Sequence, residues 1–121
     1  MSWSDWVRGA EVEPSIYAAD FARLGEQLET LMEAGTRIFQ FDVGDGHFVE
    51  PITIGPIVLK SISPLVHEHG GVLDVHLMIE RPEKHFEAVA EAGANLFVAG
   101  SSVFGKDDIA EAYRSLAQAI D

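Results

Sequence analysis

Two stretches of this chain follow the same pattern, and this repetition strongly constrains the fold. Residues 33–39 read EAGTRIF, and residues 91–97 read EAGANLF. Each stretch is typical of a helix end, a glycine that closes the helix in a left-handed turn, and the start of an apolar strand. Repeated strand–helix units of this kind form a parallel sheet covered by helices. The sequence therefore predicts an α/β fold.

The same alternation extends along the chain and predicts four strand–helix units. Strands are expected at 12–16, 38–43, 72–77 and 96–99, and helices at 20–35, 56–63, 82–93 and 107–120. Asp20 is a suitable N-cap, Pro82 suits a first helical turn, and Pro64 is expected to end its helix. At 121 residues the chain is expected to form a single domain, 1–121. The first nine residues, with Trp3 and Trp6, are expected to plug one end of the sheet or to contact another subunit.

Two of these strands carry polar side chains on one face only. Gln40 and Asp42 alternate with apolar residues on the first strand, and Asp74 and His76 do so on the next. Polar groups at the end of an apolar strand are costly to bury without a partner, so they usually belong to a site. On neighbouring parallel strands, Asp42 and His76 would face the same space. A structural hydrogen-bonded pair is the alternative interpretation.

Composition narrows the classes of function. The net charge of −12 argues against nucleic acid and anionic membrane surfaces, which require a basic surface. A small phosphorylated substrate remains compatible, because a metal ion or local backbone amides can outweigh a distant field. The absence of cysteine excludes disulfides and thiolate zinc sites, and no apolar run reaches the roughly 20 residues of a membrane span. A cytoplasmic protein is expected.

Six short motifs resemble the ribulose-phosphate 3-epimerase family. They are PSI at 14–16 with ADF at 19–21, DVGDGHF at 42–48, ITIGP at 52–56, DVHLM at 74–78 and AGSSVF at 99–104. The resemblance implies a (β/α)8 barrel that interconverts D-ribulose 5-phosphate and D-xylulose 5-phosphate. It also implies a divalent metal ion, which would be zinc, iron or manganese, and a small phosphorylated sugar as substrate.

The length of the chain departs from that family. A (β/α)8 barrel has about 250 residues and at least about 200, against 121 here. The chain resembles the first three units of the family as far as residues 92–94, and from Leu96 it resembles the eighth unit. The resemblance therefore implies that units four to seven are missing. The expected fold is a parallel (βα)4 partial TIM barrel, a half-barrel truncated from the (β/α)8 form.

The resemblance assigns metal ligands and an acid/base group. Asp42 corresponds to one of the two acid/base residues and is also a metal ligand. His76 corresponds to a second ligand, and Gln40 stands where the family has a histidine. An amide oxygen binds zinc and similar ions less well than imidazole does, so the metal is expected to bind weakly.

The resemblance also assigns substrate contacts. Ser15 corresponds to a substrate-contacting hydroxyl, and His76 also faces the substrate. Gly100 and Ser101 follow the last strand and would offer backbone amides to the phosphate. The family's second acid/base residue lies in an Asp-Gly-Gly segment on the seventh strand, and this sequence contains no such segment. Weak or absent activity is therefore expected, with Asp45 and Asp74 as candidate substitutes.

Two other interpretations remain open at this point. One is a non-catalytic half-barrel that binds a phosphorylated ligand or self-associates, because four strands leave two open edges; a homo-oligomer is expected for this reason. The other is a flavodoxin-like open sheet, which requires helices on both faces. The polar residues on one face of the strands favour the half-barrel.

Overall fold

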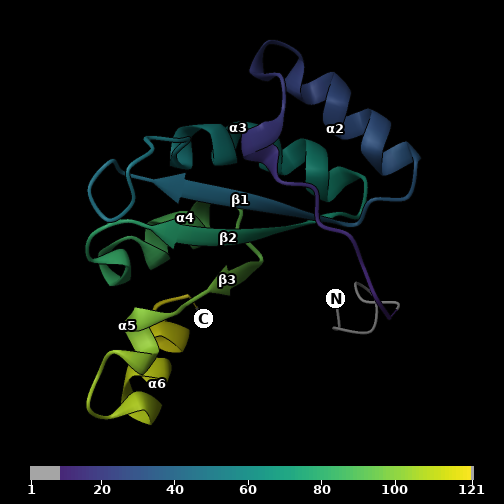
Figure 1. Cartoon of the computed structure of the whole chain (residues 1–121). Helices are drawn as coiled ribbons and strands as arrows, with labels where there is room; N and C mark the ends of the chain where they lie inside the picture. Colours follow the sequence, from purple (N-terminus) through teal and green to yellow (C-terminus); the bar gives the residue numbers. More distant parts are fainter. Residues whose placement is uncertain (1–8, 121) are drawn as a thin grey trace.

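A computed structural model describes residues 9–120 of the chain. Its sheet has three parallel strands in the order β1 (Ile38–Gly44), β2 (Val72–Met78) and β3 (Leu96–Val98), as Figure 1 shows. The register places Asp42 beside His76. The helical elements are η1 (Ile16–Ala18), η2 (Phe21–Arg23), α2 (Leu24–Glu33), α3 (Pro56–Glu68), η3 (Pro82–Lys84), α4 (Phe86–Ala92), α5 (Ser101–Phe104) and α6 (Ile109–Ala119). The expected α/β fold with a parallel sheet is confirmed.

The strand predicted at 12–16 was wrong in extent. Only Ser15 forms a bridge with Gln40, in the parallel sense, and the Gln40 amide donates to the Pro14 carbonyl at 3.0 Å. Proline has no N–H to donate to a ladder, and the chain turns into η1 directly after Ser15. A single bridge therefore occupies the position beside β1 where a first strand was expected.

The helix expected at 20–35 is present as η2 followed by α2. The Asp20 carboxylate accepts a hydrogen bond from the Ala22 amide at 3.1 Å, as expected of an N-cap. Gly35 has φ +113°, so the chain leaves α2 through the predicted left-handed glycine. The expected packing of Trp3 and Trp6 lies outside the described residues.

The prediction that Pro64 ends its helix was wrong. The α3 helix continues through Pro64 to Glu68. Proline removes the hydrogen bond that its N–H would have donated to the carbonyl four residues earlier, which belongs to Lys60. The Ser63 hydroxyl donates to that carbonyl instead, at 3.4 Å. The buried residues Leu59, Ile62 and Val66 hold both halves of the helix against the sheet.

The last two helical regions differ slightly from expectation. The helix expected at 82–93 is split into η3 and α4, and Gly93 ends it at φ +124°. The short α5 helix was not predicted. Asp108 caps α6, because its carboxylate accepts from the Glu111 amide at 3.0 Å. Within residues 9–120, no helix is both long enough and apolar enough to cross a membrane.

The hydrophobic core lies between one face of the sheet and the helices. Phe39, Phe41, Leu73 and Val75 are inaccessible to solvent and belong to one cluster with α3 and α4. Figure 1 shows α2, α3 and α4 on the same side of the sheet. A flavodoxin-like sheet needs helices on both faces, so this arrangement supports the partial barrel.

Asn95 ties the start of β3 to its neighbours. Its side-chain oxygen accepts hydrogen bonds from the Leu73 amide at 2.9 Å and from His67 Nε2 at 2.8 Å. One side chain thus connects the loop before β3 with both β2 and the end of α3. Sequence patterns did not single out Asn95, because a polar residue after a helix-ending glycine is ordinary in loops.

Candidate functional site

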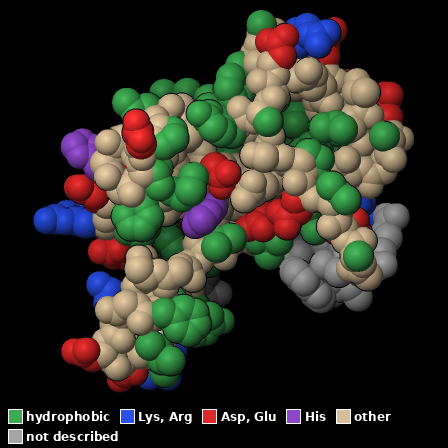
Figure 2. All heavy atoms as spheres, viewed as in Figure 1, with side chains coloured by type: hydrophobic (Ala, Val, Ile, Leu, Met, Phe, Trp, Pro, Cys, Tyr) green, Lys and Arg blue, Asp and Glu red, His purple; other side chains and the backbone are tan. Residues whose placement is uncertain are grey.

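The uncovered face of the sheet carries the polar side chains that the sequence singled out. Gln40 and Asp42 on β1 and Asp74 and His76 on β2 all lie on this face and are partly exposed. Figure 2 shows acidic side chains and a histidine gathered over the sheet on the face turned to the viewer. Because the strands are in register, Gln40 lies beside Asp74 and Asp42 beside His76.

Asp42 and His76 are close but not hydrogen-bonded. His76 Nδ1 and Asp42 Oδ1 are 3.8 Å apart, beyond hydrogen-bond range, so the structural pair considered above is not formed. Asp42 Oδ1 is shielded from solvent and has no hydrogen-bond partner. Burial raises the pKa of Asp42, the charge of His76 acts in the opposite direction, and the charge of Asp74 adds to the increase. The site therefore contains a carboxylate oxygen whose charge is poorly compensated.

These two side chains fit part of a metal-binding shell. Two ligand atoms that each lie about 2.1 Å from one ion are at most about 4.2 Å apart, so the observed 3.8 Å is compatible with a shared cation. The unpartnered Asp42 oxygen is a group that a cation would satisfy. However, residues 9–120 contain no group of three or more His, Asp or Glu side chains arranged to hold a metal ion. The fit is therefore to half of a ligand set.

A carboxyl pair that the sequence did not reveal lies next to this site. The side chain of Glu13, in the segment before the Ser15 bridge, hydrogen-bonds Asp74. Burial, this hydrogen bond and the charge of Asp74 raise the pKa of Glu13 to about 7. The sequence did not indicate this pair, because Glu13 precedes a proline in a segment that forms almost no strand. No sequence periodicity could place it over β2.

Because of the Glu13–Asp74 pair, we expect the free energy of unfolding to fall as pH rises. The folded chain keeps a proton on Glu13 up to about pH 7, whereas the unfolded chain loses it near 4.5. The folded state therefore binds more protons between these values, and the free energy of unfolding should decrease from about pH 4.5 to about pH 7. Urea titrations across this range measure the slope.

Two variants distinguish the contribution of this pair to the pH dependence of stability from that of other acidic groups. Glu13→Gln should flatten the slope between pH 4.5 and 7. Glu29→Gln removes the same charge from an exposed position on α2 and should leave the slope unchanged. Equal slopes for wild type and Glu13→Gln would show that the pair does not share a proton.

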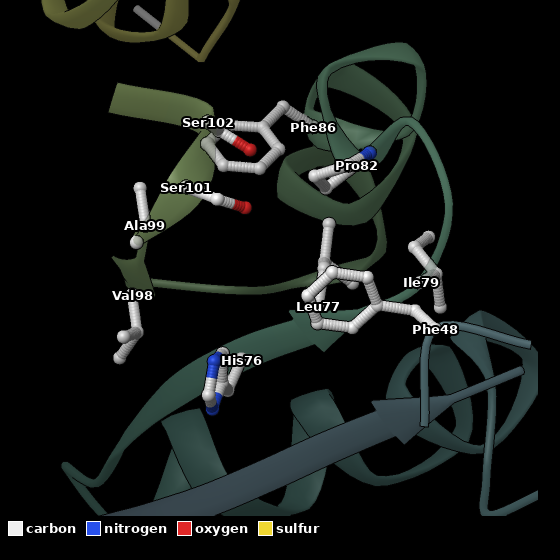
Figure 3. Close-up of a pocket in the computed structure, with 11 residues that line it drawn as sticks. Phe48, His76, Leu77, Ile79, Pro82, Phe86, Val98, Ala99, Ser101 and Ser102 are labelled. Carbon is white, nitrogen blue, oxygen red and sulfur yellow. The ribbon is translucent and has the colours of Figure 1, made fainter. Parts of the chain in front are cut away.

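A cavity of about 100 Å³ opens at the carboxyl ends of β2 and β3. Figure 3 shows His76 on β2, Val98 on β3, Ser101 at the start of α5 and Phe48 from the loop after β1 around it. Gly100 also lines this cavity. Three predicted site residues, His76, Gly100 and Ser101, are thus brought together. Phe48 and Val98 complete the walls, and the sequence had not assigned them a role.

Ser15 is placed differently. It forms its bridge with Gln40, yet it lines a separate cavity of about 330 Å³ with Leu28 and Phe39, on the side of the helices. The structure therefore does not bring Ser15 into the cavity of His76. Its predicted substrate contact stays a prediction.

Asp45, a candidate for the missing acid, anchors two loops instead. Its carboxylate accepts hydrogen bonds from the amides of His47 at 2.8 Å, Phe48 at 2.9 Å and Glu80 at 2.8 Å. The amide of Glu80 contributes most to lowering the pKa of Asp45. A carboxylate committed to three backbone donors is a poor proton donor. Asp45 therefore joins the loop after β1 to the turn after β2.

Comparison with known proteins identifies the family. The model of the ribulose-phosphate 3 epimerase family matches residues 11–99. The chain belongs to this family. The match includes Gln40, Asp42 and His76 and ends before Gly100 and Ser101. The family assignment made from the motifs is confirmed.

Individual relatives support the same family assignment. The chain is 51% identical over 85 residues to the ribulose-phosphate 3-epimerase of Synechocystis, which covers 70% of this chain and 36% of that protein. It is 44% identical over 86 residues to the Bacillus subtilis enzyme, covering 71% of this chain and 38% of that protein. The Escherichia coli enzyme is 42% identical over 87 residues, covering 70% and 37%. The chain thus matches little more than a third of the length of these curated relatives.

Proposed function

We propose that this chain binds a small phosphorylated ketose at the carboxyl ends of β2 and β3 and removes a proton from the carbon next to its carbonyl. D-ribulose 5-phosphate is the substrate that the family name suggests. The observation that carries the proposal is the Asp42–His76 pair, 3.8 Å apart beside the cavity lined by Gly100 and Ser101. The family epimerises this carbon, so the proposed step is half of that reaction.

Asp42 is the proposed base. Its raised pKa suits a group that must accept a proton, because a base works best when its pKa lies nearer to the working pH. The carbon–hydrogen bond breaks, the proton moves to the Asp42 carboxylate, and the electron pair enters an enediolate. Gly100 and Ser101, which line the cavity at the start of α5, are the proposed contacts of the phosphate group. Val98 and Phe48 form two of the walls of the cavity.

A divalent metal ion is part of the proposal. Asp42 and His76 would hold it, with Gln40 on the same face of β1 as a weaker third ligand. When bound, such an ion polarises a carbonyl oxygen and stabilises the enediolate. With two strong ligands from one chain, the ion is expected to bind weakly and to be lost on dialysis against a chelator.

Inversion requires a second acid on the opposite side of the substrate. The carboxylates on the open face of the described chain, Glu13, Asp42 and Asp74, all lie on one wall. A proton returned by Asp42 reaches the same face from which it left. One chain alone is therefore proposed to exchange this proton with solvent and to invert the carbon slowly or not at all.

Proton NMR in D2O tests this proposal. Ribulose 5-phosphate incubated with the chain and Mn²⁺ or Zn²⁺ should lose the proton at carbon 3 faster than with the metal alone. At a protein concentration where sedimentation velocity shows only monomer, xylulose 5-phosphate should accumulate much more slowly than deuterium is incorporated. Exchange no faster than in the protein-free control would refute the proposed base. Epimerisation by the monomer as fast as exchange would refute the missing-acid argument.

A second candidate is a non-catalytic half-barrel that self-associates or binds a phosphorylated ligand. The observation that favours it is the exposure of large apolar side chains near β3, where Val98 is 42% and Phe104 is 77% exposed. Lone apolar residues on a surface are ordinary, but a group beside an open sheet edge is typical of an association surface. A chain that dimerises without any proton exchange would match this candidate.

A further inference from the structure

Both ends of the sheet carry an apolar groove. At the β3 end, a cavity of about 260 Å³ lies under α6 and is lined by Phe97, Val103, Leu116 and Ile120. At the other end, a cavity of about 330 Å³ lies beside α2 and is lined by Ile16, Leu28, Leu31 and Phe39. Each groove lies in the helix layer, where a barrel would place the next strand–helix unit.

The β3 end also exposes groups that a neighbour would cover. Among the described residues, β3 pairs only with β2, so its outer backbone groups have no partner strand. Val98 is 42% exposed on β3, and Tyr113 is 63% exposed on α6. Figure 1 shows α5 and α6 at this end, beyond the last strand. Each helix of a barrel packs between two strands, and α6 lacks the second of them.

The number of strand positions suggests what covers these edges. The Ser15 bridge, β1, β2 and β3 occupy four successive parallel positions. Eight strands close into a barrel, and the interior of a barrel of this size is narrow enough to be filled by side chains. Two copies supply eight strand positions. The first position of each copy would lie beside β3 of the other copy and run parallel to it. The contact between β3 of one copy and the first position of the other then occurs twice, related by a two-fold axis, and the barrel is closed.

We propose that two copies of this chain close into one barrel around a two-fold axis and share a single metal site formed by Asp42 and His76 of each copy. The axis would run along the centre of the barrel, so the two Asp42–His76 pairs face each other. Each copy provides half of a ligand set, which includes a carboxylate oxygen that has no hydrogen-bond partner. Together they provide two carboxylates and two imidazoles.

The shared site would also supply the second acid/base group that a single chain lacks. One copy presents its carboxylates from one wall, whereas the second Asp42 would approach the substrate from the opposite wall. The proposal rests on the metal binding and the base assigned under the proposed function. It adds that inversion of the carbon, unlike exchange of its proton, requires the dimer.

Charge makes this association depend on the metal. Each chain has a net charge of −12, and Glu13, Asp42 and Asp74 lie on the face that would turn toward the partner. Two such faces repel each other when no cation lies between them. A cation held by both copies removes part of this repulsion and stabilises the dimer by mass action.

Native mass spectrometry and sedimentation velocity of the full chain test the proposal. In EDTA the chain should be monomeric, and with Mn²⁺ or Zn²⁺ it should form a dimer that carries one ion per two chains. His76→Ala should abolish the metal-induced dimer. Tyr113→Lys should weaken the dimer at the β3 end, and dimer formation should then require at least tenfold more protein. His69→Ala and Ile57→Lys, at exposed positions outside the site and the edges, should dimerise as wild type.

The outcomes separate this inference from the proposed function. A chain that stays monomeric with metal, yet exchanges the substrate proton, retains the proposed base and refutes the shared site. A dimer with two ions, or a metal-induced dimer of His76→Ala, refutes the sharing as well. Chelation of the dimer should also suppress xylulose 5-phosphate formation before it suppresses proton exchange.

Discussion

Replacing Gly93 with alanine should lower the free energy of unfolding by about 3–5 kcal/mol, the sum of backbone strain and overpacking. Gly93 ends α4 at φ +124°, a conformation that residues with a side chain rarely adopt. An added Cβ would lie 2.3 Å from Ser63 Cβ and 2.6 Å from Ser63 Oγ. Ser63 is buried in the middle of α3 and cannot move aside without shifting that helix.

Gly35 provides the matched control. It occupies the same place in the first copy of the repeated pattern and has φ +113°, but a Cβ there would meet nothing within 4 Å. Gly35→Ala should therefore cost only the backbone strain, about 1–2 kcal/mol. Urea unfolding of both variants gives the difference. Equal costs would show that α3 adjusts freely and that the contact with Ser63 does not limit the packing of α4.

A second substitution tests the contact directly. Ser63→Gly removes the Cβ that the new methyl group would meet. In a double-mutant cycle, the coupling between positions 63 and 93 should exceed about 1 kcal/mol, because the two changes act on the same contact. Additive costs would place the origin of the destabilisation elsewhere.

Local patterns were enough to predict the parts of the fold that position the site. The alternation of apolar and polar residues at 38–44 and 72–78 identified β1 and β2 and the face of each that carries Asp42 and His76. The two glycines of the repeated pattern, Gly35 and Gly93, have the left-handed conformation that the pattern predicted. These features depend on neighbouring residues only, which a sequence displays directly.

The features that were missed depend on contacts between distant segments. Pro64 remains inside α3 because burial of that helix against the sheet outweighs one lost hydrogen bond. The first strand is reduced to a bridge, since the Pro14 nitrogen cannot donate and η1 begins at Ile16. Glu13 reaches Asp74 across the sheet, a contact that no spacing in the sequence reveals.

The role of a loop residue was also not predictable from the sequence alone. The sequence offers Asp45 as a candidate for the missing acid. Its three backbone hydrogen bonds join the loop after β1 to the turn after β2, and this commits it to structure. Position along the chain indicated that Asp45 is near the site, but only the hydrogen bonds show what it does there.

Asp42→Asn should reduce the rate of substrate proton exchange by about 10²–10⁴-fold, the usual contribution of a positioned base. The amide has nearly the same shape as the carboxylate but cannot accept a proton from carbon. The exchange rate is measured by NMR in D2O with metal in excess, so that weaker metal binding does not limit the result. Asp107→Asn, which removes an exposed carboxylate from the loop before α6, should exchange at the wild-type rate.

Stability measurements on the same variant decide whether the loss is chemical. Burial raises the pKa of Asp42, and one carboxylate oxygen has no hydrogen-bond partner, so the ionised form costs free energy in the metal-free chain. Since ionisation of Asp42 is less favourable in the folded state, removing its charge should leave the metal-free chain at pH 8 as stable as wild type or more stable. An inactive variant that is also less stable would identify Asp42 as a structural residue. A stable variant without exchange activity would identify it as the base.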